Sequence, residues 1–314
     1  MALLSSLLDI RPSRWSYARR VLLAGAALAL FGLVACGGDD VDRGPTTLTV
    51  SASLDGLYWD ASQSRLVLTD DTANALRQWD GDQDFPVLAA LPAAPASGAT
   101  LGQIAKAVDG TLYTTRFGFG TDGTVVAVPR SGAAYNLNGL DAKRRRIGIT
   151  AAADGALLVG WFIKGGSGAI SELSVQGDQA SEKELVTGLG KPVGLAVTGD
   201  RLVVGDQNSG KVLAYSLSAA RAQAATEADG QVLATFTTLD GIDLMTAASD
   251  GTLYFGGSGG SLFALGPKGD IKVLATGWPK LRGVAYDEAH RRLFVAVTAV
   301  DAQSTPSIRI VPID

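Results

Sequence analysis

The sequence predicts an all-β protein that folds as one six-bladed β-propeller. Three observations lead to this prediction: a motif that recurs at spacings of 40 to 51 residues, four short apolar strands in each repeat, and no convincing amphipathic helix. Repeats of roughly 20–50 residues are typical of propellers and solenoids. Four strands per repeat match the anatomy of a propeller blade. The 39 glycines suit a chain with many tight turns.

Each repeat holds a short apolar strand, a turn with Asp or Gly, and a second apolar strand. The six copies span residues 57–70, 104–115, 147–160, 195–206, 244–257 and 284–297. Their second strands start at Leu66, Leu112, Leu157, Leu202, Leu253 and Leu293. Third strands are predicted near residues 125–128, 169–175, 211–217 and 261–265, and fourth strands near 86–91, 184–189, 232–237 and 272–277. Residues 218–228 predict a short helical insertion in the fourth blade, which explains the longest spacing.

The two ends of the propeller are predicted to meet in the sixth blade. Residues 307–313 supply its third strand and residues 46–52 its outer strand. Closing the ring in this way protects sheet edges that would otherwise be exposed. A seven-bladed ring with one degenerate repeat and a pair of β-sandwiches remain as alternatives.

The first 35 residues are predicted to be a signal peptide. Four arginines and a single acid lie within residues 1–20, and residues 21–35 carry no charge. This apolar run is shorter than the roughly 20 residues that a membrane-spanning helix needs. It ends in Leu33-Val34-Ala35-Cys36, which resembles the lipobox of bacterial lipoproteins, where the cysteine is lipidated and becomes the first residue after cleavage. Cys36 is the only cysteine in the chain, so it has no disulfide partner there.

This resemblance implies a lipid-anchored protein of the bacterial cell envelope. Residues 36–45 would be the lipidated cysteine and a flexible tether, and residues 46–314 the propeller. Gly37 stands where an aspartate would favour the inner membrane, so we expect the outer membrane, with the protein facing the periplasm. An ordinary signal peptide or anchor helix is the alternative, and Arg19-Arg20 resembles a twin-arginine signal.

Charge limits the class of partner. Residues 1–35 contain four of the 27 basic residues and one of the 31 acidic ones, which leaves 23 against 30, a net charge of −7. A nucleic-acid partner would need a basic face, so we expect no nucleic acid. We expect a monomer whose partners are the membrane, through the lipid, and a small polar ligand or an envelope protein.

Propeller geometry predicts where a site lies. The innermost strand of each blade starts at one end of the central channel, the mouth, and the second strand returns to it. The residues near the starts of the innermost strands are expected at the mouth: Asp55, Gln103, Arg146, Asp240, Asp243 and Arg282. The residues near the ends of the second strands are expected there too: Asp70, Asp71, Arg116, Trp161, Asp206 and Gln207. Convergent polar groups beside an aromatic wall suit a polar small molecule or a peptide segment. The predicted ligand-binding residues are therefore Asp55, Arg116, Arg146, Trp161, Asp206, Asp240, Asp243 and Arg282; the alternative is that each forms a salt bridge or turn cap.

Two segments resemble a known superfamily. They are PVGLAVTGDRLVVGDQNSGKVLAYSL (192–217) and LDGIDLMTAASDGTLYFGGSGGSLFAL (239–265), which look like the senescence-marker-protein/gluconolactonase and NHL-repeat propellers. The resemblance is one of repeat style and covers residues 46–314. It implies a six-bladed propeller and, for enzymes of this group, a divalent metal, usually calcium, at the mouth. A first-blade glutamate, two asparagines and an aspartate hold that ion, which suits a hard cation that polarises a lactone carbonyl.

The chain keeps part of that metal centre. Asp55 stands in place of the glutamate, and the Asp-Gly of a later blade survives as Asp240-Gly241, with Asp243 close by. One asparagine position holds Val193, which cannot ligate through its side chain, and the other falls near Gly102-Gln103. Asp55, Asp240 and Asp243 are therefore the candidate ligands of a divalent cation such as calcium. A ligand-binding protein, a metal-dependent lactonase or esterase, and an envelope scaffold all remain open.

Other chemical motifs are weak. His290, the single histidine, lies in a turn predicted on the face opposite the mouth, so no Ser-His-Asp triad is expected at the mouth. The glycine-rich runs 165–168 and 256–260 lack the lysine and the helix of a phosphate-binding loop, and we expect hairpins. The basic run 143–146 is expected to be a solvated loop, with an anion site near the channel as the alternative.

Overall fold

The computed structural model describes residues 47–313, apart from residues 83, 99, 238–239 and 302–303. The predicted signal peptide, Cys36 and the tether lie outside this range and stay predictions. Among the described residues, no helix is long and apolar enough to cross a membrane.

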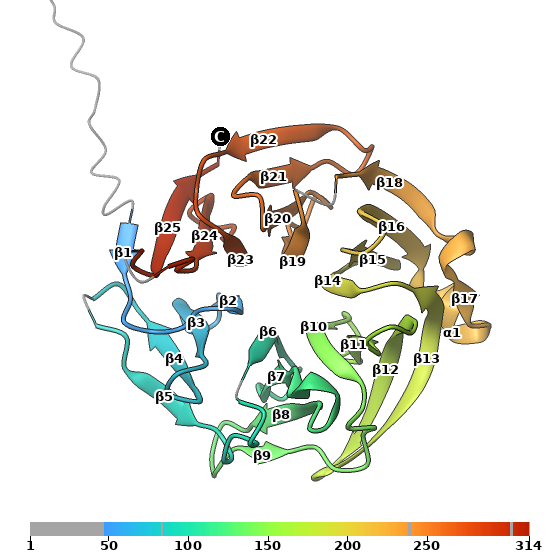
Figure 1. The fold of residues 1–314 in the computed structure, drawn as a ribbon, viewed down its shortest axis with the longest axis horizontal. Helices are drawn as coiled ribbons and strands as arrows, with labels where there is room; N and C mark the ends of the chain where they lie inside the picture. Colours follow the sequence, from blue (N-terminus) through green and yellow to red (C-terminus); the bar gives the residue numbers. More distant parts are fainter. Residues whose placement is uncertain (1–46, 83, 99, 238–239, 302–303, 314) are drawn as a thin grey trace, which may run out of the picture. The chain divides into compact units, whose positions relative to one another are not determined.

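Six sheets stand in a ring around a common axis, which confirms the predicted six-bladed propeller (Figure 1). Their strands pair antiparallel, except that the outermost strand of the third sheet pairs parallel with its neighbour. Blades 1 to 3 consist of β2 (Leu57–Asp60), β3 (Arg65–Asp70), β4 (Ala75–Trp79) and β5 (Val87–Ala90); β6 (Leu101–Lys106), β7 (Leu112–Arg116), β8 (Thr124–Val128) and β9 (Tyr135–Asn136); and β10 (Arg145–Ala151), β11 (Leu157–Phe162), β12 (Gly168–Gln176), β13 (Gln179–Leu189) and β17 (Ala225–Thr226). Blades 4 to 6 consist of β14 (Pro192–Thr198), β15 (Arg201–Asp206), β16 (Lys211–Ser216) and β18 (Gln231–Thr235); β19 (Ile242–Ala247), β20 (Leu253–Gly257), β21 (Leu262–Leu265) and β22 (Ile271–Ala275); and β23 (Leu281–Asp287), β24 (Arg292–Val297), β25 (Ser307–Pro312) and β1 (Thr47–Thr49).

The ring closes in blade 6, as the sequence predicts. β1 pairs antiparallel with β25, with Thr47 opposite Arg309 and Thr49 opposite Ser307. The first described strand is therefore the outer strand of the last blade, and the closure joins segments from opposite ends of the propeller.

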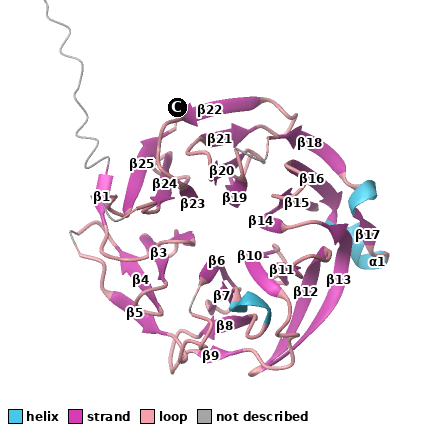
Figure 2. Ribbon diagram, viewed as in Figure 1, coloured by secondary structure: helices cyan, strands magenta, loops and turns pink. Residues whose placement is uncertain are grey.

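Helix is confined to short connections, as Figure 2 shows. α1 (Leu217–Ala222) follows β16 and confirms the predicted helical insertion in blade 4. Its N-cap is Ser216, whose hydroxyl accepts a hydrogen bond from the Ala219 amide. The single-turn 3-10 segments η1 (Gly118–Gly120) and η2 (Glu227–Asp229) lie in loops.

The core is divided among the six interfaces between neighbouring blades. Each interface holds one cluster of buried side chains; Leu158 and Ile170 of blade 3, for example, pack with Leu195 and Leu202 of blade 4. All four are completely shielded from solvent. Burying each such side chain contributes about 1.5–3 kcal/mol, so the contacts between blades hold the ring together.

Glycines let the innermost strands approach one another at the mouth. Gly56, Gly148, Gly194 and Gly283 occupy equivalent positions, next to the bulge that shifts the register of most inner strands. A Cβ at Gly148 would lie 2.6 Å from the carbonyl oxygen of Val193 in the next blade, and one at Gly56 only 2.0 Å from that of Gly102. A side chain there would push neighbouring blades apart. The remaining two blades place Gln103 and Leu244 at this position.

Candidate functional site at the channel mouth

Six equivalent positions, one near the start of each innermost strand, surround the axis at the mouth. In blade order they hold Asp55, Gly102, Ile147, Val193, Asp243 and Arg282, each directly before the glycine position described above. We call these six residues the mouth ring. Its three charged members belong to three consecutive blades: Asp243 to blade 5, Arg282 to blade 6 and Asp55 to blade 1.

Arg282 bridges the two carboxylates on either side of it. Its Nε donates to Asp55 Oδ1, and its Nη1 donates to Asp243 Oδ2 at 2.8 Å. The Arg282 side chain is 20% exposed, whereas those of Asp55 and Asp243 are 9% and 2% exposed. Burial disfavours the guanidinium charge, but the two carboxylates outweigh burial and raise the pKa of Arg282. The mouth ring therefore carries a permanent cation between two largely buried acids.

Asp71 adds a third carboxyl group to this end of the channel. It follows β3 directly, and its Oδ1 accepts a hydrogen bond of 2.8 Å from the Leu101 amide at the start of blade 2. Burial, reinforced by the negative charge of Asp55, raises the pKa of Asp71 to about 8. Its carboxyl group is therefore largely protonated at neutral pH and can donate a hydrogen bond.

Three further cations stand two residues before mouth-ring positions: Arg145, Lys191 and Lys280. Lys191 Nζ donates to Gln207 Oε1 at 2.5 Å. Burial lowers the pKa of Lys191, Asp243 opposes that change, and the charges of Arg282, Lys280 and Arg145 reinforce it. The charges of Arg145, Lys280 and Arg282 thus all act on Lys191.

An aromatic wall accompanies these cations on blades 2 and 3. The ring centroids of Phe117 and Phe119 are 4.9 Å apart, and those of Phe117 and Phe162 are 5.9 Å apart. The Arg145 guanidinium lies 5.3 Å from the Phe117 centroid, and Lys191 Nζ lies 5.6 Å from that of Phe162. Phe119 is 45% exposed. The mouth therefore offers cations next to apolar rings.

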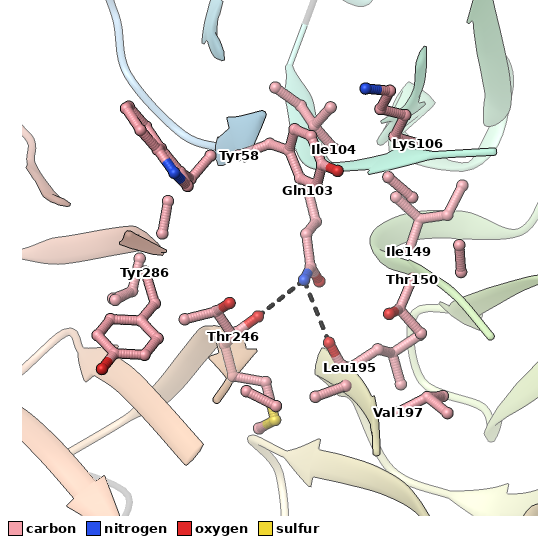
Figure 3. A pocket seen from close by; sticks show the side chains of 18 of the residues that line it. Tyr58, Gln103, Ile104, Lys106, Ile149, Thr150, Leu195, Val197, Thr246 and Tyr286 are labelled. Atoms are coloured by element: carbon pink, nitrogen blue, oxygen red, sulfur yellow. Dashed lines mark hydrogen bonds between the residues drawn. The ribbon is translucent and has the colours of Figure 1, made fainter. Parts of the chain in front are cut away.

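Gln103 crosses the channel below the mouth ring (Figure 3). Its Nε2 donates to the main-chain oxygens of Leu195 in blade 4 and Met245 in blade 5, at 3.1 and 2.8 Å. Beyond it, toward the other end of the channel, a cavity of about 400 Å³ is lined by the second halves of the inner strands. Figure 3 shows the hydroxyls of Thr150 and Thr246 on its wall. Gln103 thus separates this cavity from the charged mouth.

Two predicted site arginines are buried and hold loops in place. Arg116, at the end of β7, is 1% exposed and donates to Asn74 Oδ1 at 2.9 Å and to the Pro92 carbonyl at 3.0 Å. Arg146 is completely shielded and donates to Glu182 at 2.8 Å and to the Gly123 carbonyl at 2.7 Å. Neither arginine is hydrogen-bonded to Asp55, Asp243 or Arg282: the partners of Arg116 lie in loops, and those of Arg146 include a loop carbonyl and Glu182 of β13.

Trp161 and Asp206 also have local partners. The indole of Trp161 donates to Ser171 Oγ at 2.8 Å, and the Arg144 guanidinium covers its face at 3.7 Å from the ring centroid. Asp206 accepts hydrogen bonds from the amides of Gly190 and Lys191, at 2.9 and 2.6 Å. Asp206 therefore shapes the loop that carries Lys191 into the mouth.

The structure does not bring the three candidate metal ligands into one cluster. The Asp240 carboxylate accepts hydrogen bonds from the amide and hydroxyl of Thr237, at 3.0 and 2.7 Å, within its own turn. Asp55 and Asp243 share Arg282 instead. Within residues 47–313 as described, no three His, Cys, Asp or Glu side chains are grouped so that they could hold a metal ion. His290 lies in the turn after β23, where Nδ1 is 2.7 Å from Asp287 Oδ2.

Comparison with known proteins identifies the fold. No family model and no curated protein sequence matches the chain. Among solved structures, a gluconolactonase from Xanthomonas campestris superposes with a TM-score of 0.66 at 18% identity, covering 85% of this chain and 89% of its own. The fold is that of the gluconolactonase-like propellers. The calcium-binding protein regucalcin from Agrobacterium tumefaciens (TM-score 0.62, 15% identity, 84% and 92% covered) is similar too.

A third similar structure widens the range of chemistry on this fold. It is the PQQ-bound aldose sugar dehydrogenase from Streptomyces coelicolor, with a TM-score of 0.65, 16% identity, and coverage of 85% of this chain and 96% of its own. The predicted resemblance to gluconolactonase-like propellers is confirmed at the level of fold. At these identities the likeness carries no activity, since one fold hosts many functions.

Proposed function

We propose that this protein binds a small polar ligand at the channel mouth, and that the ligand carries an anionic group beside an apolar ring. The observation that carries the proposal is the placement of Arg145 and Lys191 against Phe117 and Phe162. Phe119, which is 45% exposed and packs edge-on against Phe117, offers an apolar surface to the ring of a ligand, and the adjacent cations form charge-assisted hydrogen bonds with its anionic group.

The charge balance of the mouth supports an anion. Four cations, Arg145, Lys191, Lys280 and Arg282, face the carboxyl groups of Asp55, Asp71 and Asp243, and the pKa of Asp71 is raised to about 8. The mouth is therefore locally positive at neutral pH although the whole chain carries a net charge of −4. A local positive potential of this kind attracts small anions.

Calorimetric titration of the full chain with three probes tests this proposal. Benzoate, benzyl alcohol and benzylamine share an aromatic ring and differ in charge, so the proposal expects benzoate to bind most tightly. Lys191→Met should weaken benzoate about tenfold or more, because one charge-assisted hydrogen bond is lost. The matched control Lys268→Met, in the exposed turn between β21 and β22, should leave binding unchanged. Equal binding of all three probes would contradict the preference for an anion.

We also propose that the propeller works at the bacterial cell envelope, held there by a lipid on Cys36. The lipobox-like sequence before the only cysteine supports this proposal. Expression of the wild type and of Cys36→Ser in a bacterial host, followed by membrane fractionation, tests it. The wild type should be recovered in the membrane fraction, and Cys36→Ser should be recovered in the soluble fraction. Retention of both proteins in the membrane fraction would contradict a lipid anchor.

A second candidate function, a metal-dependent lactonase or esterase, is favoured by the likeness to a gluconolactonase and to a calcium-binding protein. It needs an ion at the mouth, where Arg282 already pairs with Asp55 and Asp243. Lactone hydrolysis measured with added calcium distinguishes the two candidates. Calcium-dependent turnover that is lost in Asp243→Asn would favour the lactonase.

A further inference from the structure

We infer that Arg282 is the built-in cation of the mouth ring, standing where a divalent metal would bind, so that this site works without a metal ion. The inference does not depend on which ligand the mouth binds. It rests on the geometry of the mouth ring and on the charges around it.

The position of Arg282 between Asp55 and Asp243 supports the inference first. Arg282 comes from blade 6, between blade 5 with Asp243 and blade 1 with Asp55, and its guanidinium joins both carboxylates. A cation shared by these two acids would have to occupy the same space. The residues present therefore do not fit a metal ion as long as Arg282 stays paired.

The oxygen ligands that a hard cation needs are the second argument. The other members of the mouth ring are Gly102, Ile147 and Val193, none of which has a side-chain oxygen. Calcium takes 6–8 oxygen ligands and two carboxylates supply only part of them, so an ion bound here after the loss of Arg282 would take its remaining ligands from water. Arg145, Lys191 and Lys280 add repulsion toward a doubly charged ion. Both features suit a guanidinium, which needs only acceptors on its own N–H groups.

The cost of burying Asp55 and Asp243 is the third argument. Carboxylates that are 9% and 2% exposed need a counter-charge, because an unpaired buried charge strongly destabilises a fold. A metal supplies that charge only when it is present and bound. Arginine supplies it at all times, since its guanidinium stays protonated in proteins. Removing Arg282 should therefore leave two buried acids that a divalent cation can bridge.

The test compares wild type with Arg282→Met by thermal unfolding and by calorimetry, each with and without MnCl₂ or CaCl₂. We expect no saturable metal heat and no metal-dependent shift of the unfolding midpoint in the wild type. Arg282→Met should unfold at a lower temperature without metal, regain part of the loss when MnCl₂ is added, and show saturable manganese binding. Arg282→Lys, which keeps a cation, should gain no manganese binding.

Arg221→Met is the matched control. Arg221 also bridges two carboxylates, Asp154 and Glu172, both at 2.7 Å, but this cluster at the edge between blades 3 and 4 is more open to solvent, with side chains that are 28%, 55% and 26% exposed. Arg221→Met should show no manganese-dependent shift of the unfolding midpoint, because water already solvates Asp154 and Glu172. Where Arg282→Met is too unstable to purify, the double variant Asp55→Asn/Arg282→Met removes one buried charge and should recover a folded protein.

Two outcomes would overturn the inference. One is stoichiometric manganese binding by the wild type that is lost in Asp243→Asn. The other is an Arg282→Met protein that is as stable as the wild type without metal and has gained no manganese affinity. Neither outcome depends on whether benzoate binds at the mouth, so the manganese experiments and the benzoate titration test the two proposals independently.

Discussion

At the residue scale, Asp71 links the charge of the mouth to pH. Its pKa is raised to about 8, against 3.8 for an unperturbed aspartate, so the folded protein holds this proton more tightly than the unfolded chain does. The stability that Asp71 contributes is therefore complete below about pH 4 and is lost as the pH rises through 8.

Asp71→Asn should remove this pH dependence, because asparagine resembles the protonated acid and can still accept the hydrogen bond from Leu101. The variant and wild type should have similar unfolding midpoints near pH 4, and the variant should become progressively the more stable as pH rises to about 8. Thermal unfolding across this range measures the difference. Asp80→Asn, at an exposed position, is the control; a constant difference between Asp71→Asn and wild type at all pH values would refute the assignment.

Gln103 carries a stability prediction of its own. Gln103→Met keeps the approximate size of the side chain but removes the amide that bonds the main-chain oxygens of Leu195 and Met245. We expect a loss of roughly 1–3 kcal/mol in the free energy of unfolding, because buried acceptors lose their partner. Urea unfolding measures it, with the exposed Gln63→Met as control. A loss as small as that of the control would show that the bridge across the channel contributes little.

The starts of the inner strands predicted that Asp55, Asp243 and Arg282 lie at the mouth, where the structure pairs them, but not which residues surround them. Asp55, Asp243 and Arg282 were predictable because the repeat fixes which position of each blade faces the axis. Phe119 was not, since its place depends on a loop conformation with φ of +51°, which no periodicity encodes. Lys191 had a readable signal: it is one of three basic residues that stand two positions before the mouth ring.

At the element scale, the strand–turn–strand pattern of each blade was readable because every inner pair is apolar and bounded by turn residues. The glycine positions beside the mouth ring were not recognised from sequence. Glycine is needed at these positions because one blade approaches the next closely, and this contact exists only in the assembled ring.

Gly148→Ala tests that close approach. The new Cβ would lie 2.6 Å from the Val193 carbonyl oxygen, so blades 3 and 4 must separate. We expect a loss of about 1–3 kcal/mol in stability, as for other overpacked sites. Gly166→Ala, where the nearest atom would be 3.5 Å away, should change stability by about 0.5 kcal/mol or less. Equal effects of the two substitutions would mean that the blades adjust without strain.

At the scale of the whole molecule, ring closure by β1 depends on contacts between segments far apart in sequence. The sequence predicted this pairing because the sixth repeat lacks an outer strand of its own and residues 46–52 supply an apolar one. Leu48 of β1 packs against the cluster between blades 6 and 1.

Deleting Thr47–Thr49 should expose the edge of β25 and lower stability by roughly 1–3 kcal/mol, through lost strand pairing. The free edge should also promote self-association. Urea unfolding and light scattering measure the two effects. Deletion of residues 40–42, in the predicted tether, should produce neither; an unchanged unfolding midpoint without β1 would show that closure is dispensable.

A crystal structure of the protein grown with manganese, with anomalous scattering recorded at the mouth, would show which cation lies between Asp55 and Asp243. We expect the Arg282 guanidinium between Asp55 and Asp243, with no anomalous peak there. A manganese peak bound by these two aspartates, with Arg282 turned away, would contradict the inference that an arginine supplies the cation of this site.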